Sequence, residues 1–125
     1  MSPAPTARTR TVVTHRAERH GWPLCERCGV ALGTNVHHRR PRGAGGSKDP
    51  ATNTPSNLLL LCGSGTTGCH GWVESNRAAA YRHGWLLRSW QVPLDVPVRI
   101  HDRGLVLLDD HGGMTSAPES PSSAA

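Results

Sequence analysis

The sequence predicts a small α+β domain that needs a bound metal ion for stability. The chain has 125 residues, which is one ordinary domain or less. Hydrophobic residues make up 36% of it, with no Phe and one Tyr, so its core is small. Small cores usually need a disulfide, a metal or a partner, and four cysteines are present: Cys25, Cys28, Cys62 and Cys69. We expect one domain over residues 10–110, between a disordered arm at 1–9 and a disordered tail at 111–125.

The first half of the chain should hold a basic helix and a short strand. Residues 10–20 are compatible with a short basic helix that ends at Gly21. A Cys-x2-Cys turn follows, and a second turn signal lies at residues 33–35. Residues 36–38, "VHH", leave that turn as a short strand. Residues 41–56 contain three Gly and three Pro, which predicts a loop.

The second half should begin with an apolar segment and a helix. Residues 57–62, "NLLLLC", are apolar and precede a Gly, Ser and Thr loop. Residues 69–84 have an Ala-rich helical composition and end at a glycine. Residues 85–90 and 96–110 are expected to be strands, and the Asp-Arg-Gly sequence at 102–104 predicts a C-terminal β-hairpin.

The net charge of +5 is unevenly distributed. Residues 1–48 carry nine Lys and Arg against two Glu, a net charge of +7, whereas residues 49–125 carry −2. A basic half favours a nucleic-acid partner. The alternative is a skewed composition, because thirteen of the fourteen cationic residues are Arg and Ala, Gly and Pro are abundant.

The N-terminus has no signal-peptide pattern, and no segment approaches the ~20 apolar residues of a membrane span. We therefore expect a soluble, cytoplasmic protein. In a reducing compartment four cysteines favour metal binding over disulfides.

The cysteine spacing predicts a structural zinc site. Cys25 and Cys28 have two residues between them, so one tight turn can present both thiolates. Cys62 and Cys69 have six residues between them, all Gly, Ser or Thr. Four thiolates in a tetrahedron form a structural zinc site; two disulfides or four free buried thiols are the alternatives. Such a site would tie the turn before the "VHH" strand to the start of the 69–84 helix.

The segments "VHHRRP", "NLLLLC" and "CHGWVE" occur in the order typical of a nuclease motif. Over residues 25–77 the chain resembles the HNH endonuclease family, the ββα-metal nucleases, and its flanks resemble small phage-encoded HNH proteins. The resemblance implies a treble-clef-like ββα-metal fold that hydrolyses DNA phosphodiester bonds with a divalent metal, nicking double-stranded DNA. The 18 residues between His38 and Asn57, and the long gap between the last two cysteines, depart from the commoner family spacing.

The resemblance implies a role for each residue of the motif. His38 matches the general base, and Asn57 matches the asparagine that ties down the loop and holds that base. His37 and His70 match ligands of the catalytic metal. Glu74 lies four residues after His70 and shares its helix face, so it is a third candidate ligand.

Local sequence leaves alternatives open for three of these residues. Asn57 fits the N-cap of the apolar segment equally well. His70 is adjacent to Cys69, so it fits the structural zinc site as well as a catalytic one. Glu74 also fits a solvated helix surface.

The chemistry agrees with these roles. Phosphodiester hydrolysis needs an activated water, which a neutral imidazole can supply near pH 7, and relief of phosphate charge, which a divalent ion can supply. Two His and a carboxylate suit Mn²⁺, Ni²⁺, Co²⁺ or Zn²⁺ better than Mg²⁺. Arg39, Arg40 and Arg42 follow the histidines, where they are predicted to bind DNA phosphates.

Adjacent histidines on a strand point to opposite faces, so His37 and His38 can share a site only if the strand ends there. Pro41 and the glycine-rich loop predict that ending. Double-stranded DNA is the expected partner, and the resemblance to phage proteins implies a packaging terminase as well. The alternative functions are a non-catalytic zinc-binding DNA-recognition module and a structural adaptor in a packaging complex.

Overall fold

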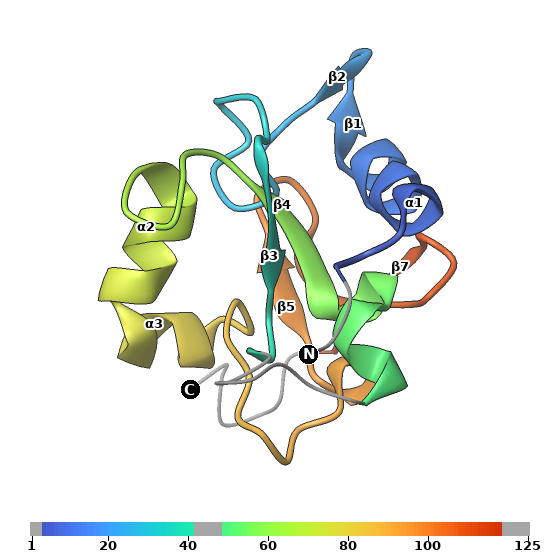
Figure 1. Cartoon of the computed structure of the whole chain (residues 1–125), viewed down its shortest axis with the longest axis vertical. Helices are drawn as coiled ribbons and strands as arrows, with labels where there is room; N and C mark the ends of the chain where they lie inside the picture. Colours follow the sequence, from blue (N-terminus) through green and yellow to red (C-terminus); the bar gives the residue numbers. More distant parts are fainter. Residues whose placement is uncertain (1–3, 42–48, 119–125) are drawn as a thin grey trace.

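The computed structural model describes residues 4–41 and 49–118 and is a small α+β structure, as the sequence predicts. Short helices surround a central antiparallel strand pair, and a three-stranded antiparallel sheet is formed by the C-terminal segment (Figure 1). The described residues also contain three short 3-10 helices: η1 (Pro50–Asn53), η2 (Pro55–Asn57) and η3 (Pro93–Asp95). No helix in the described ranges is long and apolar enough to cross a membrane.

Helix α1 (Ala7–Ala17) begins within the predicted arm and ends before the predicted boundary. The Thr6 side chain accepts a hydrogen bond from the Thr9 backbone N–H (3.1 Å), which caps the first turn. The chain then forms a hairpin between β1 (Glu18–Arg19) and β2 (Trp22–Pro23). His20 and Gly21 both have positive φ, 55° and 83°. This turn favours a hairpin over a continued helix, so residues 18–20 leave the helix earlier than expected. Residues 7–9 also differ from the expectation, because they belong to α1 and not to a disordered arm.

The central pair consists of β3 (Asn35–His38) and β4 (Leu58–Leu61), with His37 opposite Leu59 and His38 opposite Leu58. All four leucines of β4 are buried. Leu58 and Leu60 pack with Val13 and Ala17 of α1, whereas Leu59 and Leu61 join the main core. Because successive side chains alternate across a strand, β4 is covered on both faces and fixes the position of β3.

The predicted helix over 69–84 is two helices, α2 (Gly68–Ser75) and α3 (Arg77–Arg82). Asn76 separates them with φ −125° and ψ 56°, and its side-chain amide donates to the Trp72 carbonyl (2.9 Å). The predicted stop at Gly84 is confirmed. Its φ is +77°, and a Cβ there would lie 2.0 Å from the Pro97 carbonyl oxygen.

Residues 85–90 form no strand, contrary to the expectation. The Trp85 and Leu86 backbone N–H groups donate to the Ala80 carbonyl, at 2.9 and 3.2 Å, and the Leu87 N–H donates to the Arg39 carbonyl, at 2.7 Å. These side chains are buried, so the segment is a core connection whose backbone N–H groups bond to α3 and to the residue after β3 instead of to a β-ladder.

The C-terminal sheet contains β5 (Val98–Ile100), β6 (Gly104–Leu108) and β7 (Met114–Ser116). The predicted hairpin turn lies between β5 and β6 and is confirmed. Strand β7 lies within the predicted disordered tail and pairs with β6. The Asp109 carboxylate accepts from the backbone N–H groups of His111 (2.7 Å) and Gly113 (2.8 Å), which folds the turn before β7. Residues 119–125 of that tail lie outside the described residues.

Candidate metal centres

The four cysteines come together, as their spacing predicts. Ligand atoms of Cys25, Cys28, Cys62 and Cys69 all lie within 4.8 Å of one another, and all four thiols are free. The first two belong to the turn after β2, the third follows β4, and the last lies in the first turn of α2. This group can hold a metal ion, and it joins the end of the central strand pair to the start of α2.

Two glycine turns shape the cysteine group. Gly29 follows Cys28 with φ +66°, and a Cβ there would meet the His101 ring at 2.1 Å. Gly63 follows Cys62 with φ +83°, and a Cβ there would lie 2.1 Å from the Thr67 carbonyl oxygen. Both positions need the left-handed backbone that glycine adopts at little cost. The turns direct backbone N–H groups at sulfur, from Cys28 to Cys25 (3.5 Å) and from Cys69 to Cys62 (3.4 Å).

The thiols differ in acidity because their surroundings differ. Burial raises the pKa of Cys25, and burial likewise raises the pKa of Cys69 to about 12. At Cys28 burial acts in the same direction, but hydrogen bonds from the backbone N–H groups of Ala31 and Val30 outweigh it and lower the pKa to about 7. Four thiolates at this spacing repel one another, so a divalent cation is the counter-charge that would let all of them ionise.

Arg27 supports the cysteine group, a role that no pattern in the sequence indicates. Its Nη1 donates to the Cys69 sulfur at 3.2 Å. Its guanidinium carbon lies 3.8 Å from the Trp72 ring centroid and 4.7 Å from that of Trp85. Both contacts are within cation–π range. Stacking on two indoles therefore holds a positive charge beside a sulfur of the candidate metal group.

A second group consists of His37, His70 and Glu74, whose ligand atoms also lie within 4.8 Å of one another. His37 comes from β3 and the other two come from α2, where i and i+4 share a face. The His37 and His70 ring centroids are 5.1 Å apart, and His37 Nδ1 lies 4.0 Å from Glu74 Oε1. His70 thus faces His37 and Glu74, which favours the second site over the cysteine site for this side chain.

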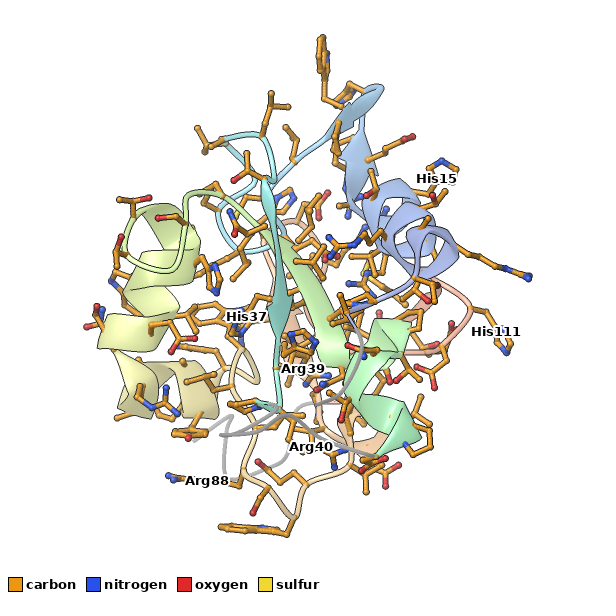
Figure 2. All side chains as sticks on the ribbon, viewed as in Figure 1. His15, His37, Arg39, Arg40, Arg88 and His111 are labelled. Atoms are coloured by element: carbon orange, nitrogen blue, oxygen red, sulfur yellow. The ribbon has the colours of Figure 1, made fainter. Side chains whose placement is uncertain are left out.

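His37 is held as a neutral imidazole with a defined tautomer. Its Nε2 lies 2.8 Å from the Trp85 carbonyl oxygen, which can only accept, so Nε2 carries the proton and Nδ1 carries the lone pair. Burial lowers the pKa of His37 to about 4, and the hydrogen bond to Trp85 opposes this only in part. Figure 2 shows the ring extending from β3 toward α2.

His38 enters the same pocket from the end of the strand. The pocket has a volume of about 340 Å³, and its lining is Ala4, Pro5, Arg10, Val36, His37, His38, Pro41, His70 and Glu74. His37 and His38 are the last two residues of β3, and both line this pocket.

Asn53 is the carboxamide partner of the His38 ring, a residue that sequence analysis did not single out. His38 Nε2 lies 2.8 Å from Asn53 Oδ1, which accepts, so the lone pair of His38 lies on Nδ1. Asn57 is fully buried and holds the loop instead: its Oδ1 accepts from the Arg40 backbone N–H (2.8 Å) and its Nδ2 donates to the Thr52 carbonyl (2.9 Å). Asn57 thus has the expected loop-binding role, while the ring contact belongs to Asn53.

The prediction that Arg39 binds DNA is wrong. This side chain is fully buried and donates to four carbonyl oxygens: Gly84 (2.8 Å), Ser56 (2.8 Å), Pro93 (3.2 Å) and Val96 (2.8 Å). Figure 2 shows Arg39 in the middle of the molecule, beside the lower half of β3. A buried guanidinium satisfied by backbone carbonyls organises loops and cannot reach a phosphate.

The other two predicted DNA-binding arginines differ from each other. Arg40 is partly exposed and donates to the Gln91 carbonyl (2.9 Å) and to the Asp49 carboxylate (2.6 Å). Arg42 lies outside the described residues. Arg10, on α1, is an exposed cation that lines the pocket, and only the fold reveals that position.

Comparison with protein-family models finds no match for the chain, and comparisons with curated proteins and with solved structures find none either. The case for a function therefore depends on the side chains themselves.

Proposed function

We propose that this chain is a metal-dependent HNH-type endonuclease that hydrolyses DNA phosphodiester bonds and nicks double-stranded DNA. The observation that carries the proposal is the group of His37, His70 and Glu74, within 4.8 Å of one another, in a pocket that His38 also lines. Two imidazoles and a carboxylate beside a further imidazole supply both a metal site and a base.

The ion proposed for the cysteine group is zinc. Soft thiolates favour Zn²⁺, and the backbone N–H groups directed at two sulfurs stabilise their charged forms. The role of zinc would be structural, because the four sulfurs complete a tetrahedron and connect the central strands to α2.

The donor set fits a divalent ion at the second group. His37 presents an unprotonated Nδ1, and the Glu74 carboxylate lies beside it. His70 Nδ1 is buried without a hydrogen-bond partner among the described residues, and such orphaned polar atoms often mark a bound ion or water. Mn²⁺, Ni²⁺, Co²⁺ and Zn²⁺ suit imidazole donors better than Mg²⁺. The chemistry supplied by a divalent ion here is neutralisation of charge on the scissile phosphate.

His38 is proposed as the general base. Its Nε2 lies 2.8 Å from Asn53 Oδ1, a contact that fixes the ring beside the pocket in which a water would be activated. Asn53 thereby orients the ring, much as a carboxylate or carbonyl orients other catalytic histidines. Asn57 supports the same site indirectly, because it holds the backbone at Arg40, after His38, and at Thr52, before Asn53.

The charge distribution supports DNA as the substrate. The basic half of the chain contributes α1 and β3, and the exposed Arg10 lines the pocket. A cation in this position can contact a phosphate that flanks the scissile bond. The terminase partner rests on the phage resemblance alone.

The test is a time course on supercoiled plasmid at low salt with Mn²⁺. The wild type should accumulate open circles before linear DNA, because the described part of each chain holds one such His, His and Glu group. His38→Ala should lower the nicking rate by ~10²-fold or more, the usual contribution of a general base. His15→Ala is the matched control, since His15 is exposed on α1 (Figure 2).

Full nicking activity of His38→Ala would exclude His38 as the general base. No cleavage by wild type with Mn²⁺, Mg²⁺, Ni²⁺, Co²⁺ or Zn²⁺ would favour the non-catalytic zinc-binding alternative.

A further inference from the structure

A second pocket lies next to the proposed nuclease site, and nothing above assigns it a role. It has a volume of about 380 Å³ and is lined by two arginines, two aromatic residues and three others. The residues that matter are Arg40, Tyr81, Arg88 and Trp90. Pro41 lines both this pocket and the His38 pocket, so the two sites adjoin.

The pocket walls are held in place by the arginines that follow β3. The Arg39 carbonyl accepts from Leu87 N–H (2.7 Å), and Arg40 Nη1 donates to the Gln91 carbonyl (2.9 Å). Residues 88–91 form a turn, in which Gln91 N–H donates to the Arg88 carbonyl (3.0 Å) and Arg88 N–H donates to Gln91 Oε1 (2.7 Å). This turn presents Trp90 in a fixed backbone position beside the end of β3.

Trp90 and Arg88 are exposed, and their polar side-chain groups make no hydrogen bond or ion pair with other described residues. The Trp90 side chain is 77% exposed. The Arg88 guanidinium carbon lies 3.7 Å from the Tyr81 ring centroid, and within residues 4–41 and 49–118 its side chain makes no hydrogen bond or ion pair. A stacked, exposed guanidinium of this kind has its N–H donors available for an anion.

The combination of groups selects a ligand class. A free phosphate would use the two guanidinium groups but leave the indole and phenol rings without a role. An apolar ligand would use the rings and leave the Arg88 guanidinium, which has no ion-pair partner among the described residues, facing it. A nucleotide uses both, because its base stacks on aromatic faces and its phosphate pairs with arginine. In an intact duplex the base faces are already stacked, so only an unstacked nucleotide can present one.

We propose that this pocket binds an unstacked nucleotide of the DNA, with the base on Trp90 and its phosphate near Arg88 and Arg40. The inference rests on the proposed nuclease function and refines its substrate to DNA with an unpaired nucleotide beside the cleaved bond. Figure 2 shows Arg40 and Arg88 at the same end of the molecule, where strand β3 ends.

The test measures binding without cleavage. Fluorescence anisotropy at fixed low salt, without added Mn²⁺, compares a labelled single strand, a duplex of the same sequence and that duplex with a two-nucleotide bulge. Trp90→Ala should weaken binding of the single strand and the bulged duplex about tenfold, the typical effect of losing one stacked base. Binding of the intact duplex should change less than twofold.

Two further variants test the stacking and the phosphate contact separately. Trp90→Phe retains an aromatic face and should recover most of the single-strand affinity. Arg88→Gln should weaken binding and reduce the slope of log K against log salt by about one.

The matched control is Trp22→Ala. Trp22 is 63% exposed on β2, at the opposite end of the molecule from the end of β3 (Figure 1), and its removal should alter none of the affinities. Because both tryptophans are exposed, melting temperature and zinc content should match those of the wild type in every variant.

The proposal is overturned if Trp90→Ala weakens all three DNAs equally, if it weakens none, or if the wild type binds no single strand. A proline-rich peptide that binds through Trp90 while DNA does not would identify a protein-recognition groove instead. Plasmid nicking is measured separately. If the wild type nicks DNA but Trp90→Ala changes no affinity, the nuclease function stands and this inference fails. If the wild type does not nick but Trp90→Ala selectively weakens binding of unpaired DNA, the nucleotide pocket stands and the nuclease function fails.

Discussion

Replacing Arg39 by methionine should destabilise the domain strongly rather than weaken DNA binding selectively. Methionine has a similar reach but no donors, so four carbonyl oxygens that now accept from the guanidinium would lose that partner. These carbonyls belong to loops before β4, after α3 and around η3, which Arg39 holds against the end of β3. The substitution therefore removes a junction between segments far apart in the sequence.

The magnitude follows from the number and burial of these bonds. Hydrogen bonds to a charged group contribute about 1.5–3 kcal/mol each, which for four bonds gives an upper bound of about 6–12 kcal/mol. Burial lowers the pKa of Arg39 to about 9, so desolvation of the cation offsets much of that gain. Breaking a buried charged network usually costs about 3–5 kcal/mol. Against a total stability of about 5–15 kcal/mol, that loss lowers the melting temperature by roughly 15 °C or more.

The assay is thermal unfolding of zinc-loaded protein by far-UV circular dichroism, with Arg103→Met as the control. Arg103 is exposed on the β5–β6 turn and lies 3.9 Å from Asp102, a contact that contributes less than about 1 kcal/mol. Arg39→Lys should also destabilise the domain, because one ammonium cannot reach four separate carbonyls. A melting temperature of Arg39→Met within 2 °C of wild type, together with lost DNA affinity, would refute the structural role and restore Arg39 as a DNA contact.

Three other changes have expected outcomes. Cys25→Ser should abolish stoichiometric metal content and cooperative unfolding, because metal binding and folding are coupled in such small domains; an unchanged spectrum with normal zinc content would contradict the cysteine centre. His37→Ala and His70→Ala should slow nicking but recover partly at raised Mn²⁺, since affinity is the lost quantity, and metal titrations identical to wild type would exclude them as ligands. Deleting residues 114–125 should lower the melting temperature by several degrees, because β7 pairs with β6; an unchanged melting curve would show that this pairing adds no stability.

Residue spacing alone predicted part of both candidate metal groups. The Cys-x2-Cys turn and the i, i+4 relation of His70 and Glu74 are properties of adjacent residues, and the structure brings both sets together. The hairpin between β5 and β6 was likewise readable from its turn residues. A short segment determines the local geometry of the Cys-x2-Cys turn, of the His70 and Glu74 pair and of the hairpin, whereas joining the two cysteine pairs, and joining His37 to α2, depends on the fold.

The sequence predicted the ends of helices and strands less well where one residue interrupts a favourable composition. The composition of residues 69–84 favours one helix, but the Asn76 side chain closes the first helix on the Trp72 carbonyl. Strand β7 lies in a Gly- and Ser-rich stretch, and it forms because β6 offers an open edge and Asp109 folds the turn toward it.

The sequence by itself determined which residue types could bind metal and which half of the chain is basic. Only the tertiary structure decided which of the neighbouring cations are usable. Arg39 and Arg40 are consecutive, yet one satisfies buried carbonyls and the other lines an open pocket. The tertiary structure also decided that Asn53, and not Asn57, contacts the His38 ring. The physical reason is that burial depends on what packs against a side chain, and here the neighbours come from segments tens of residues away.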